Sequence, residues 1–235
     1  MIKLMRPDME FHEKLIKYRY VDGLLAIGLF LIMCALYAML AVLEIQYSGI
    51  KESIIFVGCG FNVFMIAIAI LFIKIRKEKL SSIGLYNGKW KQSCLTGVIL
   101  AAFLFFNNCL SHIIGGANLI AIGDIFKFSI YYLTIALCEE IVFRGYIGTR
   151  LYGIMANQYL VITVSGVLFV AMHFPYRMIA YGMTFSDLTI YNMGWILDLF
   201  ITHIVLSFIY MKTNSLYGSI IPHWMSNLAY NLIAR

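Results

Sequence analysis

The sequence is poor in charge and in proline. Asp, Glu, Lys and Arg make up 13% of its 235 residues, and only three residues are Pro. Ordinary globular proteins carry about 25% charged residues. Hydrophobic residues reach 62%, and the mean hydropathy is +0.84. A water-soluble domain of this size cannot bury so much apolar surface. The composition therefore excludes a water-soluble protein and predicts a protein surrounded by lipid.

Acidic residues are scarcer than basic ones, which gives a net charge of +6. In a membrane protein such an excess marks cytoplasmic loops, so we expect no nucleic-acid partner. Thirteen of the 18 Lys and Arg residues fall on one side of the predicted spans. They lie in the N-terminal segment, in residues 74–91, and at Arg150 and Lys212. This asymmetry predicts a cytoplasmic N-terminus.

Closely spaced cysteines are lacking. The five cysteines show no C-x-x-C spacing, and all lie inside or at the edge of apolar stretches. A disulfide framework or a zinc ribbon is therefore not expected. Buried thiols that act as small hydrophobic side chains are the default interpretation. These residues are Cys34, Cys59, Cys94, Cys109 and Cys138.

Long apolar stretches dominate what is present. A spanning helix needs about 20 largely apolar residues. The sequence predicts an all-α, polytopic membrane protein with seven spans. The spans are expected within 23–43, 53–73, 94–114, 128–147, 151–176, 190–211 and 216–233. Residues 175–189 are long enough to hold a short interfacial or re-entrant helix, which would make eight helical segments.

The chain divides by content into three predicted parts. Residues 1–22 form a cytoplasmic N-terminal segment, and residues 23–123 form the first three spans. Residues 124–235 form the remaining spans, where the ionisable side chains inside spans gather. No internal repeat or low-complexity tract interrupts this division.

The fourth predicted span carries three charged residues, Glu139, Glu140 and Arg144. Each costs on the order of 2.5–3.5 kcal/mol to insert at the centre of a span, so such residues are functional by default. On an α-helix, Glu140 and Arg144 share a face, whereas Glu139 points about 100° away. We expect Arg144 to neutralise Glu140 and Glu139 to face another helix. The alternative is a purely structural ion-pair network.

Two later spans carry histidines. His173 follows Phe169 by one helical turn, so the phenyl ring can pack on the imidazole. His223 and Asn227 are also one turn apart and project from one face. A histidine and an asparagine on one face can donate hydrogen bonds to an oxyanion. Taken singly, each is equally well explained as a hydrogen bond between helices.

Signatures of other intramembrane proteases are missing. The zinc-binding H-E-x-x-H helix is absent, since His12-Glu13 lacks the second histidine. No serine follows a glycine by two positions, which excludes the rhomboid-type motif. Asp124 follows Gly123 but lacks the first glycine of the aspartyl G-x-G-D motif. The remaining pattern is E-E-x-x-x-R, then F-x-x-x-H, then H-x-x-x-N, each in its own apolar span.

This ordered pattern resembles the family of CAAX proteases and bacteriocin-processing enzymes (CPBP, also called Abi or type II CAAX prenyl endopeptidases). The likeness covers residues 128–235 and includes the segment 215–223 that leads into the last motif. It implies an intramembrane endopeptidase that hydrolyses a peptide bond near the membrane surface, with residues 124–235 as its catalytic core and a polar catalytic cavity among the spans. CAAX-type processing, peptide maturation and bacteriocin self-immunity are the processes it implies, and the short chain favours the bacterial branch.

The resemblance also implies roles for individual residues. Glu139 and His173 would activate the attacking water, and His223 and Asn227 would stabilise the oxyanion. Glu140, Arg144 and Phe169 would support and orient them. Many members of the family are labelled metalloproteases, which would make Glu139, His173 and His223 zinc ligands. The set of one carboxylate, two histidines and one asparagine favours the version without a cofactor.

Two other functions compete with the peptidase. One is a catalytically silent membrane scaffold or regulator of the same fold, and the other is an ion-coupled transporter that uses the same carboxylates. Intact motifs argue against the first. The absence of repeated halves argues against the second. Asp198 and His203 lie in the sixth predicted span but outside every motif, so their roles stay open.

The expected partners are the lipid bilayer and a peptide or protein substrate, prenylated if it is of the CAAX type. The protein is expected in the cell membrane of a bacterium. The natural substrate, the cleavage rule and the oligomeric state do not follow from the sequence.

Overall fold

The computed structural model of the chain describes residues 7–47, 49, 53–85 and 89–233. Helices and short connections make up this part of the chain, and a single bridge pairs Leu119 with Ile233. The all-α prediction is therefore confirmed. The chain forms two compact units, Met1–Ile54 with Phe143–Phe208 and Ile55–Val142 with Ile209–Arg235.

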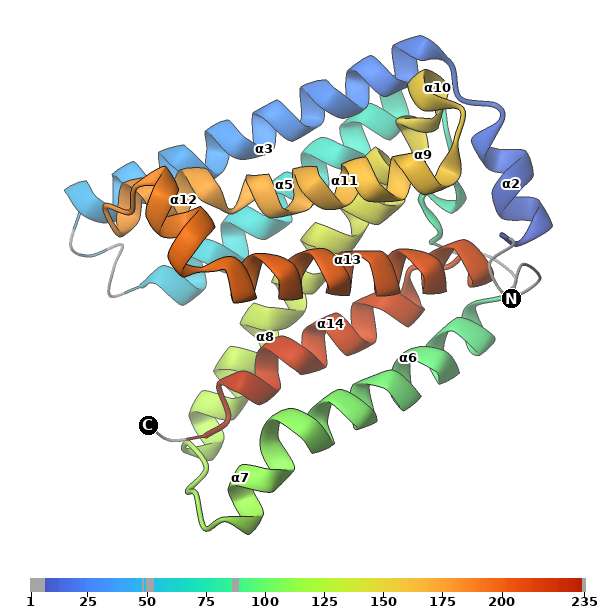
Figure 1. Cartoon of the computed structure of the whole chain (residues 1–235). Coiled ribbons are helices and arrows are strands. Elements are labelled where there is room, and N and C mark those ends of the chain that lie inside the picture. The colour runs from blue at the N-terminus through green and yellow to red at the C-terminus, as the bar shows by residue number, and fades with distance from the viewer. Residues whose placement is uncertain (1–6, 48, 50–52, 86–88, 234–235) are drawn as a thin grey trace. The chain divides into compact units, whose positions relative to one another are not determined.

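Unit 1 is built around α3, a long apolar helix that lies along α11 and α12 (Figure 1). The start of α3 is fixed by Asp22, whose carboxylate accepts a hydrogen bond from the Arg19 amide at 2.8 Å. Asn157 caps α11 in the same way by accepting from the amides of Tyr159 and Leu160. The elements of unit 1 are α2 (Met9–Leu15), α3 (Tyr20–Gln46), α9 (Gly148–Arg150), α10 (Tyr152–Met155), α11 (Gln158–Met172), α12 (Phe174–Ala180), η4 (Asp187–Tyr191) and most of α13 (Met193–Thr213).

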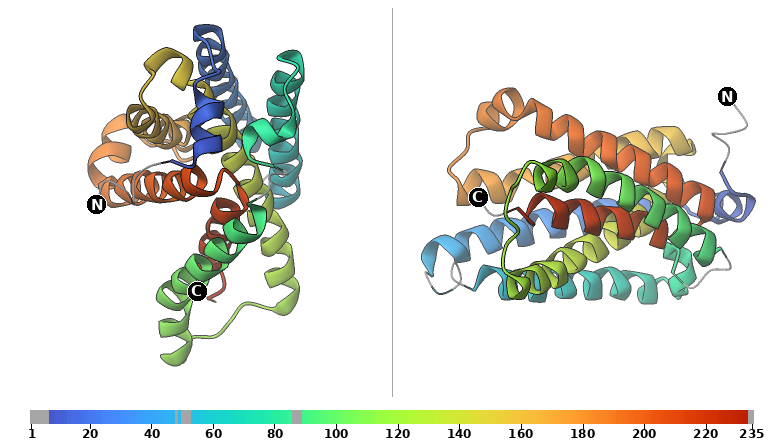
Figure 2. Two further views of the ribbon diagram at one scale, coloured as in Figure 1. Left: turned by 90° about the vertical axis from the view of Figure 1, so that its right-hand side faces the viewer. Right: turned by 90° about the horizontal axis from the view of Figure 1, so that it is seen from below.

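Unit 2 places α14 against both α6 and α8 (Figures 1 and 2). Its apolar centre at the carboxyl end of α14 includes Cys109, Leu228, Ala229 and Leu232. The elements of unit 2 are α5 (Ile54–Ile75), η1 (Leu80–Ile83), α6 (Trp90–Phe105), η2 (Phe106–Leu110), α7 (Ser111–Ile114), α8 (Ile122–Glu139), the start of η3 (Glu140–Ile147) and α14 (Tyr217–Tyr230). The helices η3 and α13 run from one unit into the other.

Small residues allow α6 and α14 to pack backbone to backbone. A Cβ atom added to Gly97 would lie 3.1 Å from the Gly218 Cα. The buried Ser93 hydroxyl accepts a hydrogen bond from the Gly218 amide at 2.7 Å and donates to the Ser215 carbonyl at 3.0 Å. The Thr213 hydroxyl also reaches Ser93, at 3.2 Å. This network fixes the N-terminal half of α14, the helix that carries His223 and Asn227.

Helices occupy all seven stretches in which spans are expected. Within the described residues, four are long and apolar enough to cross a membrane: Tyr20–Gln46, Ile54–Ile75, Gln158–Ala180 and Met193–Thr213. They correspond to the first, second, fifth and sixth predicted spans. The helix Trp90–Phe105 is apolar but shorter. An integral membrane protein is thus supported, while the count of seven or eight spans stays a prediction.

The stretch 175–189 contains most of α12 and the start of η4. All five cysteines are free thiols, of which Cys109 and Cys138 are buried. The division at residues 22/23 and 123/124 and the cytoplasmic N-terminus stay predictions. Four residues counted for that orientation, Lys3, Arg6, Lys51 and Arg235, lie outside the described residues.

Candidate functional site

Glu139 and Glu140 lie where α8 gives way to the π-helix η3. Glu139 is 5% exposed and Glu140 is completely buried. A π-helix pairs residues five apart, and such segments are frequent at functional sites. Glu140 and Arg144 both lie in this π-helix rather than in the α-helix that the spacing assumed, and the pairing expected between their side chains stays a prediction.

In unit 2, His223 lies between the two carboxylates. Its Nδ1 atom is 2.7 Å from Oε1 of Glu140, which is a short hydrogen bond. Its Nε2 atom is 3.5 Å from Oε2 of Glu139, which is too long for a good hydrogen bond but close enough for an ion pair. The imidazole is thus held by Glu140 on one side and turns its other nitrogen toward Glu139.

The position of His223 follows from its helix. Pro222 precedes it inside α14 and has no N–H to donate to the carbonyl of Gly218. Asn227 lies one turn beyond His223 on the same α-helix, so the shared face expected from the H-x-x-x-N spacing is confirmed. Asn227 is partly exposed, whereas His223 is buried. The amide of Asn227 is therefore the more accessible of the two groups.

In unit 1, His173 ends α11, and its ring is oriented by its own helix. The Nδ1 atom lies 2.8 Å from the carbonyl oxygen of Phe169. A carbonyl oxygen only accepts hydrogen bonds, so Nδ1 must carry the proton. In the neutral imidazole this leaves the lone pair on Nε2, which is the nitrogen that can accept a proton from water.

The Phe169 ring is the centre of an aromatic group in unit 1. It is 2% exposed and meets His173 at a centroid distance of 5.2 Å. The two rings meet at 75°, so the expected contact is confirmed, although it is edge-to-face. The Phe143 ring lies 5.2 Å away, and the Arg144 guanidinium lies 5.4 Å from the Phe169 centroid. Arg144 is thus placed against the F-x-x-x-H motif.

His203, whose role the sequence leaves open, belongs to the same group. It is completely buried, its ring lies 5.3 Å from that of Phe169, and its Nε2 atom is 3.0 Å from the Ser165 hydroxyl. Trp195 was not singled out by the sequence, yet its ring meets His173 edge-on at 5.6 Å. Asp198 is exposed on α13. No motif spacing links α13 to α11, so sequence reasoning had no signal for His203 or Trp195.

A metal site is not complete within either unit. Among the described residues, no three His, Cys, Asp or Glu side chains of one unit are grouped as metal ligands. Catalytic zinc sites use three protein ligands. Unit 2 offers Glu139 and His223, and the third ligand that the resemblance implies, His173, belongs to unit 1. No step is therefore assigned to a metal.

The structure thus brings together Glu139, Glu140 and His223 in unit 2, and Arg144, Phe169 and His173 in unit 1. The polar catalytic cavity expected among the spans stays a prediction.

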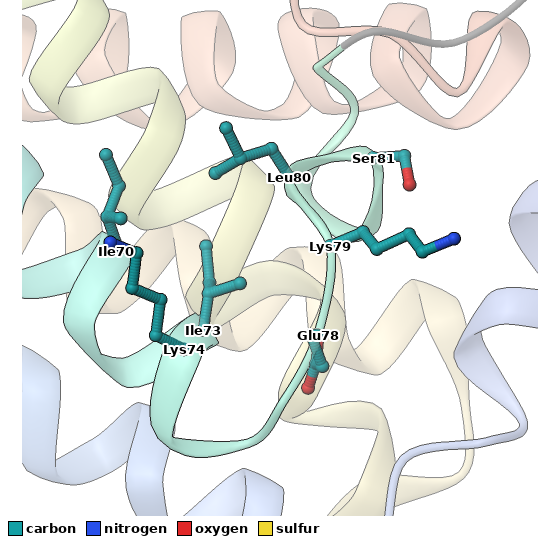
Figure 3. A pocket seen from close by; sticks show the side chains of 7 residues that line it. All are labelled: Ile70, Ile73, Lys74, Glu78, Lys79, Leu80 and Ser81. Carbon is teal, nitrogen blue, oxygen red and sulfur yellow. The ribbon is translucent and has the colours of Figure 1, made fainter.

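A pocket of about 680 Å³ lies elsewhere in unit 2, at the end of α5. Its lining is basic and apolar and contains none of the predicted site residues (Figure 3): Ile70, Ile73, Lys74, Glu78, Lys79, Leu80 and Ser81.

Comparison with known proteins gives a family match for part of the chain. Residues 121–229 match the family model described as type II CAAX prenyl endopeptidase Rce1-like. The matched stretch contains all seven residues named in the three motifs. No curated protein and no solved structure matches the chain. Over residues 121–229 the chain thus resembles the Rce1-like type II CAAX prenyl endopeptidases, and this match supports an intramembrane peptidase at the level of the family.

Proposed function

We propose that the protein hydrolyses a peptide bond near the C-terminus of a prenylated peptide or protein, at the membrane, with water activated by Glu139 and His173. The family match supports the substrate class, because its description names CAAX prenyl endopeptidases. The observation that carries the proposal is the placement of His223 between Glu139 and Glu140. A buried histidine held by one carboxylate and turned toward another is an arrangement suited to proton transfer.

The proposed reaction begins with the loss of a proton from water. Glu139 accepts this proton while His173, through Nε2, accepts a hydrogen bond from the same water. The hydroxide oxygen forms a bond to the carbonyl carbon of the substrate, and the carbonyl oxygen takes the negative charge. The proton then passes to the amide nitrogen, the C–N bond breaks, and an acid and an amine leave.

The oxyanion needs donors at the moment when its charge develops. With Nδ1 donating to the Glu140 carboxylate, His223 would donate to the oxyanion from Nε2 as the doubly protonated imidazolium, and Asn227 would donate from its side-chain amide. Each such donor is worth about 10²–10³ in rate when it is removed from an oxyanion site. Glu140 would hold the His223 ring, while Phe169 and Arg144 would hold His173. These three residues are proposed to position the reacting groups.

The proposal is tested with the purified chain in liposomes and a quenched fluorescent peptide that ends in a farnesylated CAAX sequence. Glu139→Gln, His173→Ala and His223→Ala are expected to lower kcat at least about 100-fold, the range of a lost general base or oxyanion donor. Asp124→Asn is the matched control, since it removes an exposed carboxylate from the same helix as Glu139. Its activity should equal that of the unmodified chain.

Two results would decide against parts of this proposal. Full activity of any of the three variants would remove that residue from the reaction. Folded protein that cleaves no peptide would favour the silent scaffold. Zinc is tested separately, by treatment with a chelator followed by added metal. Cleavage that persists in metal-free protein would assign the water activation to Glu139 and His173 alone.

A further inference from the structure

Arg177 lies one helical turn beyond His173, on α12. Its backbone amide donates to the His173 carbonyl, so the two residues are joined through the helix itself. The guanidinium carbon lies 3.7 Å from the centroid of the Trp195 ring. That is a close cation–π contact, and guanidinium groups stack well on aromatic faces.

The Trp195 indole also contacts His173, which is proposed to help activate the water. Trp195 meets the His173 imidazole edge-on, with centroids 5.6 Å apart at 84°. The cation and the imidazole are therefore arranged about one ring that comes from a third segment, the start of α13. This arrangement fixes Arg177 at a defined, short distance from the group proposed to activate water.

The stacking leaves the hydrogen-bond donors of Arg177 available. Within the described residues, no hydrogen bond or ion pair joins its guanidinium to another side chain. Arg177 is half-buried, and its guanidinium carries five N–H donors. A cation placed in this way is suited to bind an anion.

We propose that Arg177 binds the terminal carboxylate of the substrate and so selects free C-terminal peptides. This inference rests on the proposed peptidase function. The planar guanidinium fork matches a carboxylate in a bidentate fashion. Three extended residues span about 10 Å, and the distances from His173 to Trp195 and from Trp195 to Arg177 together fall within that reach. A bond three residues from the terminus would thus meet His173 while the terminus meets Arg177.

A phosphate of a lipid headgroup offers the same anionic chemistry. The experiment therefore uses two substrates and two membranes. The substrates are one farnesylated CAAX peptide as the free acid and the same peptide as the C-terminal amide. The membranes are phosphatidylcholine vesicles with and without phosphatidylglycerol. Activity is measured as kcat/KM for the unmodified chain, Arg177→Gln, Arg177→Lys and the exposed-loop control Arg76→Gln.

The unmodified chain should prefer the free acid roughly 10- to 100-fold, the range of one hydrogen bond to a charged group. Arg177→Gln should abolish this preference by slowing cleavage of the acid while sparing the amide. Arg177→Lys should retain part of it, because the charge remains and the fork is lost. Arg76→Gln should leave the preference unchanged. The proton-transfer groups are untouched, so cleavage of the amide also verifies that each variant is folded.

Four results would overturn the inference. One is that the ratio of kcat/KM for the free acid to kcat/KM for the amide is the same in Arg177→Gln as in the unmodified chain. Another is an effect of Arg177→Gln that depends on phosphatidylglycerol and not on the substrate terminus, which would assign Arg177 to a lipid phosphate. The third is a chain that cleaves neither peptide, which would remove the proposed function and this inference with it. A chain that cleaves both peptides equally removes the inference alone.

Discussion

The contact between α6 and α14 makes Gly97 a sensitive test of the structure. A methyl group at this position would lie 3.1 Å from the Tyr217 carbonyl oxygen and 3.1 Å and 3.2 Å from the Gly218 Cα and carbonyl oxygen. Ordinary contacts between carbon atoms are about 3.5–4.0 Å. All three neighbours are backbone atoms, so no side chain can rotate away, and the helices must separate by several tenths of an ångström.

The expected cost follows from two opposing effects. Overpacking of a well-packed interface costs typically 1–3 kcal/mol. Alanine in place of glycine inside a helix contributes about 0.5–1 kcal/mol in the opposite direction. Gly60→Ala is the matched control, because Gly60 lies inside α5 and an added Cβ meets nothing within 4 Å. The helix-propensity effect is common to both variants, so Gly97→Ala should be about 1–3 kcal/mol less stable than Gly60→Ala.

The measurement is reversible unfolding of the two variants in mixed micelles, followed by helix content and by cleavage of the farnesylated peptide. Activity of Gly97→Ala should fall with its stability, since α14 carries His223 and Asn227. Equal stability of Gly97→Ala and Gly60→Ala would refute the backbone contact between α6 and α14. Higher stability of Gly97→Ala than of Gly60→Ala would do so more strongly, because the helix-propensity effect is common to both variants and the added methyl group would then be stabilising.

Three further predictions concern the two clusters and one exposed turn. Glu140→Gln should keep a hydrogen bond to His223 and lose less activity than Glu140→Ala, which leaves a buried imidazole without its partner; equal loss in kcat would contradict the positioning role. Phe169→Ala should destabilise the chain by about 3–5 kcal/mol, the usual range for a buried phenyl group, as measured by thermal unfolding. Hydrogen bonds from the Thr184 hydroxyl and then its amide hold the pKa of the exposed Asp187 below its usual value of 3.8. A lowered pKa stabilises the folded turn above the unfolded value and is lost as pH falls through the folded one. The protection factor of the Leu188 amide against exchange should therefore fall below about pH 4, and Thr184→Val should weaken this dependence because only the amide bond to Asp187 remains; an unchanged protection profile would refute the capping.

Much of the fold follows from local sequence. Apolar stretches of about 20 residues predict helices whatever their neighbours are, because a backbone in lipid must satisfy its own hydrogen bonds. The H-x-x-x-N spacing similarly places His223 and Asn227 on one face, since 3.6 residues per turn sets that geometry within one helix. The argument from spacing assumes a regular α-helix, so it does not predict the π-helix that follows Glu139.

The sequence by itself determined the membrane setting, the helical class and the motifs that lead to the family. The tertiary structure decided which side chains meet: Glu140 with His223, Phe169 with His203, and Arg177 with Trp195. These partners come from helices far apart in the chain. Their contact depends on how each helix is rotated and where it crosses the next, and that is set by packing of whole surfaces rather than by the period of any one segment.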